Sequence, residues 1–181
     1  NIVLSILISL LMIYSIRKEV DRTLVMRLVK GSLIGLILGI FIYLYANITL
    51  LKLSIGIIIG ILTILLVCQF SIQRRINRDY KIGGLSGLLT TSIGVPGPPL
   101  LLYFSGTDMA PRTLRSTTLA YYLFVYSASL MMQVSLAGTN RLVWTASLTA
   151  LIPLLLGIYL GNKLIYKINR QLFRLITYVI R

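Results

Sequence analysis

The sequence has no histidine, and only four of its 181 residues are acidic. The acids are Glu19, Asp21, Asp79 and Asp108, and each lies in a segment that we expect to be a loop. A metal site built from histidine and carboxylate ligands is therefore not expected. An intramembrane proton relay of histidines or carboxylates lacks its side chains for the same reason. These absences argue against a hydrolase or another enzyme, and no cofactor is expected.

Cysteine and charge are scarce as well. The single cysteine, Cys68, lies in an apolar run, where we expect a buried small hydrophobe, and it cannot form a disulfide within the chain. Only 12% of the residues are charged and 57% are hydrophobic, whereas a soluble domain carries about 25% charged residues. The composition predicts an all-α polytopic integral membrane protein.

The charges that are present are mostly basic, with 18 Lys and Arg residues and a net charge of +14. They cluster between the apolar stretches, as in the cytoplasmic loops of membrane proteins, so nucleic acid is not an expected partner. We predict a partial helix at 1–16, spans at 31–51, 53–72, 116–136 and 142–162, and the start of a last helix at 171–181. The chain begins with Asn1, and its first apolar run is shorter than the roughly 20 residues of a span. We therefore expect that an N-terminal part is missing.

The most informative stretch is 82–107, which has no charged residue. Near its middle, Gly94 to Pro99 contains three prolines, and a helix cannot run through them. Unwound backbone at membrane depth is tolerated only where it is buried in protein or lines a water-filled cavity. The stretch therefore predicts a re-entrant or broken helix at about 82–107. A helix kinked only for packing is the alternative.

The basic residues favour a hairpin over a single crossing. If 82–107 crosses the membrane once, they divide ten against seven between the two sides. If it returns to the side from which it came, 15 of the 18 lie together, with Lys52 and Arg141 opposite and Arg181 unassigned. The positive-inside rule favours the second arrangement.

Two segments indicate an internal repeat. The run 33–41 (LIGLILGIF) matches 151–159 (LIPLLLGIY) at an offset of 118 residues, and the basic flanks lie at opposite ends of the two copies. This pattern is typical of inverted-topology repeats in secondary transporters. We assign 1–81 to the end of the first repeat and 82–181 to the second.

Glycines recur at four-residue spacing, at Gly31, Gly35 and Gly39 and again at Gly56 and Gly60. Small residues at this spacing let helix backbones approach closely in lipid. We expect them to serve packing.

The break suggests a binding site for an anion. Two helix ends would meet there, with the hydroxyls of Thr90, Thr91 and Ser92 on one side. Gly94 and Gly97 would let the backbone approach a ligand. The expected backbone donors are the amides of Gly97, Leu100 and Leu101.

Two further residues complete the expected substrate-binding set. Arg115 can attract the anion at the membrane surface, or it can be an ordinary loop charge. Thr117 offers a hydroxyl at a helix start, where capping is its alternative role.

These segments resemble a known family. The residues GLSGLL at 84–89 and GVPGPPLLLY at 94–103 resemble the second signature of the TauE/SafE sulfite exporter family, also called the 4-toluene sulfonate uptake permease family. RSTTL at 115–119 and the segment from Pro153 to Gly161 resemble later parts of the same family. The first-half counterpart of the signature is absent, as expected if the N-terminal part is missing. The resemblance implies a multi-pass plasma-membrane transporter of sulfur-containing anions.

The resulting hypothesis is a secondary transporter of small anions, such as sulfite or sulfonates, that works by alternating access. Its expected partners are a small anionic substrate and the lipid bilayer, and a homo-oligomer is left open. A passive anion channel and a non-transporting membrane scaffold subunit are the alternatives.

Overall fold

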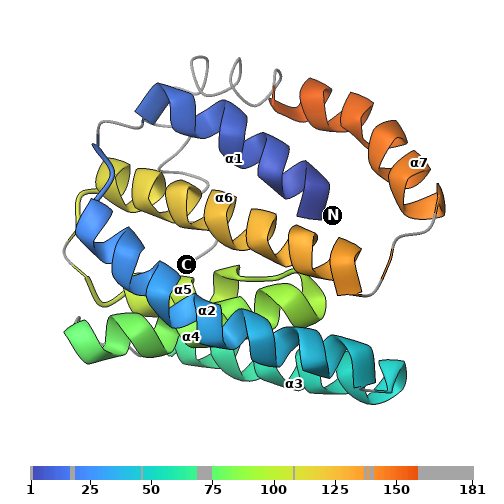
Figure 1. Cartoon of the computed structure of the whole chain (residues 1–181). Coiled ribbons are helices and arrows are strands. Elements are labelled where there is room, and N and C mark those ends of the chain that lie inside the picture. The colour runs from blue at the N-terminus through green and yellow to red at the C-terminus, as the bar shows by residue number, and fades with distance from the viewer. Residues whose placement is uncertain are drawn as a thin grey trace. The chain divides into compact units, whose positions relative to one another are not determined.

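The computed structural model describes residues 2–16, 19–45, 47–68, 75–107, 109–136, 138 and 141–158. All regular secondary structure in these ranges is helical (Figure 1). The elements are α1 (Ile2–Ile16), α2 (Arg22–Tyr45), α3 (Ile48–Val67), α4 (Ile76–Ile93), α5 (Gly97–Phe104), α6 (Pro111–Leu136) and α7 (Arg141–Thr149). The chain divides into two compact units, Asn1–Thr139 with α1 to α6 and Asn140–Arg181 with α7.

Two of the described helices, α2 and α6, are long and apolar enough to cross a membrane, judged by length and composition. They contain 24 and 26 residues. At 1.5 Å per residue, each is longer than the hydrocarbon core of a bilayer, which is about 30 Å thick.

Helices begin earlier than the charge pattern predicted. The segment 22–30, expected to be part of a basic loop, forms the first turns of α2. The Asp21 carboxylate caps this helix, because its Oδ1 atom accepts a hydrogen bond of 3.0 Å from the Leu24 N–H. Likewise, α6 begins at Pro111 rather than at residue 116, and proline is favoured at a first helical position. The loop expectation was wrong for these turns, because a cap at Asp21 and a proline at Pro111, and not the charges, set the helix starts.

Glycines join α2 to α4 over most of their length. The contacts pair Gly31 with Tyr80, Gly35 with Gly84, and Gly39 with Leu88. Each step is four residues on both helices, so α2 and α4 run parallel. A Cβ atom on Gly31 or Gly35 would overlap a backbone carbonyl of α4, which confirms the packing role of the α2 glycines.

The glycines of α3 behave differently. A Cβ atom on Gly56 or Gly60 would meet nothing within 4 Å. The packing expectation for these two residues was therefore wrong within the part of the chain that the structure describes.

The stretch that contains the three prolines forms two helices with a break between them, and the first helix starts earlier than expected. The helix α4 begins at Ile76, so 76–81 is helical and not part of the expected loop. It ends at Gly94, whose φ of 78° is a left-handed conformation that suits glycine. The helix α5 then begins at Gly97.

The chain reverses its direction at the break. The Ser86 hydroxyl donates a hydrogen bond of 2.9 Å to the Pro96 carbonyl, and the Tyr103 hydroxyl donates to the Asp79 carboxylate. Asp79 lies seven residues before Ser86, and Tyr103 lies seven residues after Pro96. The helix α5 therefore runs back along α4, antiparallel to it.

The next helix starts where α5 ends. The Tyr121 hydroxyl donates to the Gly83 carbonyl over 3.3 Å, and the Gln133 amide donates to the Thr91 carbonyl over 2.8 Å. The second bond lies closer to the C-terminus than the first on both helices, so α6 runs in the same direction as α4. In Figure 1, α2, α4 and α6 all begin at one end of the first unit, on the left, where α5 ends.

The core of the first unit lies between α2, α5 and α6. Its buried residues are Leu24, Leu28, Leu36, Leu100, Tyr103, Phe104, Tyr121 and Val125. Three of these belong to α5, so this short helix is held by packing as well as by hydrogen bonds.

In the second unit, α7 is followed by a turn at Ala150, and the chain is helical again over 151–158. Pro153 explains the turn, because it has no N–H to donate to the Thr149 carbonyl. The end of the expected span 142–162, the last residue of the second repeat copy and the expected helix 171–181 lie outside the described residues.

Candidate functional site

Several backbone carbonyls at the end of α4 accept hydrogen bonds from nearby groups. The Gly94 N–H donates to the Thr90 carbonyl over 2.7 Å, and the Val95 N–H donates to the Leu89 carbonyl over 3.4 Å. The first of these bonds, closed by a residue in the left-handed conformation, is that of the αL motif that ends many helices. The Gln133 side-chain amide of α6 donates a hydrogen bond to the Thr91 carbonyl. The Leu89, Thr90 and Thr91 carbonyls therefore have partners beyond the helix.

The three hydroxyls expected to bind substrate face their own helix. Thr90 donates to the Ser86 carbonyl over 2.6 Å, Thr91 to Gly87 over 3.3 Å, and Ser92 to Leu88 over 2.7 Å. All three side chains are buried. Their protons are used inside α4, so in this arrangement they offer only oxygen lone pairs to a ligand.

The start of α5 has one free backbone donor. Pro96 is the N-cap and Gly97 the first helical residue, and the two prolines that follow have no N–H. Leu100 and Leu101 are then the fourth and fifth residues, whose N–H groups face carbonyls one turn earlier. The Gly97 N–H is therefore left as the donor, and the Leu100 and Leu101 amides are not.

A tyrosine hydroxyl lies beside Gly97. The Tyr122 hydroxyl of α6 is 3.2 Å from the position that a Cβ atom on Gly97 would occupy. Tyr126, one turn further along α6, packs edge-on against Tyr122 with ring centroids 5.7 Å apart. Sequence reasoning missed Tyr122, and its only signal was a pair of adjacent tyrosines in an apolar helix.

Arg115 and Thr117 lie at the start of α6, away from the break. Arg115 is exposed, and its guanidinium lies 4.0 Å from the Met12 sulfur of α1. It precedes Tyr122 by seven residues, which places both on one face of α6, about 10 Å apart along the axis. Thr117 is fully buried and accepts a hydrogen bond of 3.0 Å from the Asp21 N–H. Thr117 thus links α6 to the start of α2 and does not reach the break.

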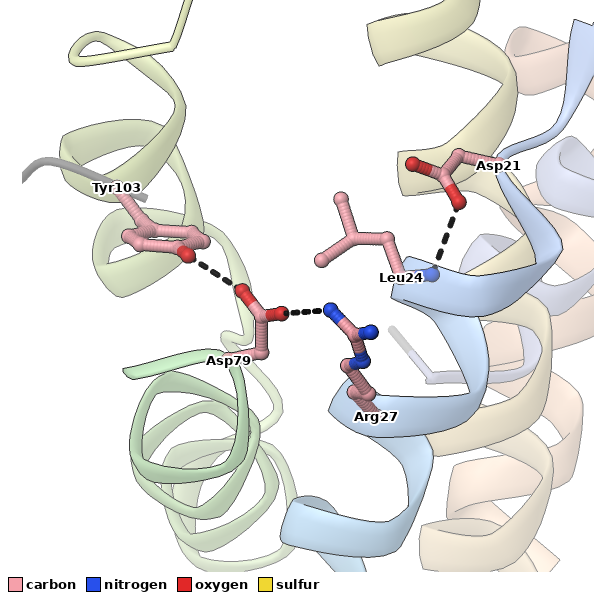
Figure 2. A network of polar contacts seen from close by, with 5 residues as sticks. All are labelled: Asp21, Leu24, Arg27, Asp79 and Tyr103. Atoms are coloured by element: carbon pink, nitrogen blue, oxygen red, sulfur yellow. Dashed lines mark hydrogen bonds and ion pairs between the residues drawn. The ribbon is translucent and has the colours of Figure 1, made fainter. Parts of the chain in front are cut away.

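A buried carboxylate joins three helices at the same end of the unit (Figure 2). Asp79, in the first turn of α4, has no solvent exposure. It accepts a hydrogen bond from the Tyr103 hydroxyl of α5 and pairs with the Arg27 guanidinium of α2 over 3.2 Å. The Arg27 side chain is 27% exposed. The expectation that every acid lies in a loop was wrong for Asp79, because α4 begins at Ile76.

Comparison with known proteins gives one result. The family model described as Sulfite exporter TauE/SafE matches residues 1–180. No curated protein and no solved structure matches the chain. The matched range extends far beyond the glycine- and proline-rich signature and includes every described helix. The chain belongs to the sulfite exporter TauE/SafE family, a family of membrane transporters and not of enzymes.

Proposed function

We propose that the protein is a multi-pass secondary transporter of the plasma membrane, which moves small sulfur-containing oxyanions such as sulfite or sulfonates by alternating access. The observation that carries this proposal is the break at Gly94–Pro96 inside the uncharged stretch 82–107. Discontinuous helices of this kind form the substrate sites of many secondary transporters. The class of substrate comes from the family to which the chain belongs.

The reversal of the chain supports a re-entrant hairpin. The helix α4 begins, and α5 ends, at the end of the unit where α6 starts. After Lys81, the uncharged part of α4 extends to Ile93. These residues measure about 18 Å, close to half the thickness of a hydrocarbon core of about 30 Å. The break would then lie near the middle of the bilayer.

The distribution of charge supports an orientation. Basic residues gather in the first turns of the three helices that start together, at Arg22, Arg27, Lys30, Arg75, Arg78, Lys81, Arg112 and Arg115. Lys52 lies near the start of α3, which begins at the other end. By the positive-inside rule, the basic end faces the cytoplasm.

We propose a revised set of groups that would hold the anion. We propose the Gly97 N–H and the Tyr122 hydroxyl as direct donors, because they lie together at the N-terminus of α5. Thr90, Thr91 and Ser92 would shape the end of α4, and Gly94 would allow its turn. Arg115 would attract the anion to the mouth of the hairpin.

The helix α1 covers this route. A Cβ atom on Gly94 would lie 3.6 Å from the Ile2 side chain, and Met12 lies beside Arg115 at the other end of α1. We propose that movement of α1 away from α6 opens the route between Arg115 and the break. An inverted repeat, with copies at 33–41 and 151–159, would supply the second half of such a movement.

Replacing Arg115 with Ala is expected to reduce sulfite uptake into proteoliposomes about fivefold at low substrate concentration and low salt, because the charge steers the anion to the mouth. The difference should shrink at high salt. The matched control is Arg112→Ala, whose side chain is 85% exposed and lies 3.8 Å from Glu19. Equal uptake by Arg115→Ala and the unmodified protein would remove Arg115 from the transport route.

The kinetics of the unmodified protein test the proposed function itself. A secondary transporter gives saturable uptake of radiolabelled sulfite, and unlabelled sulfite inside the vesicles accelerates that uptake by counterflow. Linear uptake without counterflow would instead indicate a passive channel. If the protein neither takes up nor binds any sulfur oxyanion, it is a scaffold and not a transporter. Either of these results, channel-like uptake or no uptake and no binding, would overturn the proposal.

A further inference from the structure

We infer that Asp79 is a positioning residue for the proposed anion site. Its carboxylate holds α5 in place through Tyr103 and ties that helix to α2 through Arg27. The inference rests on the proposed function, because it assigns to Asp79 the task of keeping the Gly97 N–H where the anion binds.

The helix α5 needs side-chain bonds to other helices to hold its position. It has only eight residues, and an isolated helix of fewer than about 12 residues is marginal in water. Side-chain hydrogen bonds attach it to α4 at both ends, from Ser86 to Pro96 and from Tyr103 to Asp79. The first bond lies at the break, and the second fixes the direction in which α5 leaves it.

A carboxylate is well suited to this position. Tyr103 is fully buried, so its hydroxyl requires a hydrogen-bond partner inside the protein. Hydrogen bonds to an ionised acceptor are roughly twice as strong as neutral ones. A buried carboxylate in turn requires a positive partner, and Arg27 supplies it from α2 (Figure 2).

The helices that carry Asp79 and its partner Arg27 are also packed closely together. The glycines at Gly31 and Gly35 hold the backbones of α2 and α4 together directly above this level. Arg27 and Asp79 therefore come from two helices that cannot easily move apart. Asp79 lies seven residues before Ser86, which bonds to Pro96 at the start of α5, and so about 10 Å from that point along α4. It therefore acts on the site through α5 and does not touch the anion.

This role has a kinetic signature. If the tie is weakened, α5 holds the binding-competent position for a smaller fraction of the time, and the apparent affinity falls by that fraction. The half-saturating concentration of substrate then rises, while transport at saturation is retained. A purely structural defect would lower the maximal rate and leave the half-saturating concentration unchanged, because it lowers the amount of folded transporter without changing its affinity.

The test is Tyr103→Phe, which removes one hydroxyl and keeps the buried ring. In proteoliposomes with radiolabelled sulfite, we expect the half-saturating concentration to rise about three- to tenfold, with the maximal rate per folded transporter within about twofold of the unmodified protein. The matched control is Tyr80→Phe, because Tyr80 is next to Asp79 on α4 but is 38% exposed. Its half-saturating concentration should not change.

The outcomes separate the two proposals. The positioning role is overturned if Tyr103→Phe has an unchanged half-saturating concentration or shows only a lower maximal rate. In that case, saturable uptake by the unmodified protein still supports the proposed function. Absence of saturable uptake by the unmodified protein overturns both. If Tyr103→Phe does not fold, Asp79→Asn takes its place, because it removes the charge but keeps an oxygen acceptor for Tyr103. Its half-saturating concentration must also rise.

Discussion

Replacing Gly35 with Leu is expected to prevent the first unit from folding. Even a Cβ atom at Gly35 would overlap the Gly84 carbonyl, and the contact is with backbone that cannot turn aside. Overpacking of a close contact costs about 1–3 kcal/mol, occasionally more, and separating α2 from α4 would also break the contacts of Gly31 and Gly39. We expect a cost at or above the upper end of that range.

Thermal unfolding and size-exclusion chromatography in detergent measure this effect. Gly35→Ala should already lower the midpoint of unfolding, and Gly35→Leu should give little monodisperse protein. The matched control is Gly56→Leu, because a Cβ atom on Gly56 meets nothing within 4 Å. Normal behaviour of Gly35→Leu would contradict the parallel α2–α4 packing.

Replacing Asp79 with Ala is expected to have the second large effect on stability. It would leave the Arg27 guanidinium and the buried Tyr103 hydroxyl without their shared acceptor. Removing one partner of a buried ion pair costs about 3–5 kcal/mol. Because Arg27 is 27% exposed, water relieves part of the loss, so we expect a value near the lower end.

The control for Asp79→Ala is another ion pair of the unit, that of Glu19 and Arg112. Glu19 lies 3.8 Å from Arg112, and the two side chains are 38% and 85% exposed. Exposed pairs of this kind contribute about 0–1 kcal/mol, so Glu19→Ala should unfold close to the temperature of the unmodified protein. Equal unfolding temperatures for Asp79→Ala and Glu19→Ala would show that the Asp79 carboxylate is not a buried junction.

The break in the hairpin could be predicted from sequence because its cause is local. Three prolines between Gly94 and Pro99 cannot continue a helix in any surroundings. The close packing at Gly35 could be predicted for a similar reason, since a small residue at four-residue spacing has few other uses in a membrane helix.

The surroundings of the break could not be predicted, because they depend on where the helices begin. Treating every charged residue as part of a loop hid the capping role of Asp21 and placed Asp79 outside α4. The start of α5 at Gly97 makes Leu100 and Leu101 its fourth and fifth residues, and this removed their amides from the set of donors. Tyr122 joined the site only through the packing of α6 against α5.

The central claim is that the chain from Ile76 to Thr107 returns to the side of the membrane from which it came. Single cysteines at Asn77 and Ser105, both exposed, test it in a Cys68→Ser background when a membrane-impermeant thiol reagent is added to intact cells. A third cysteine at the exposed Thr49 of α3 reports the opposite side. We predict that Thr49→Cys is labelled from outside and that Asn77→Cys and Ser105→Cys are labelled only after the cells are opened. Labelling of Asn77→Cys and Ser105→Cys from opposite sides would contradict the hairpin and the transport site built on it.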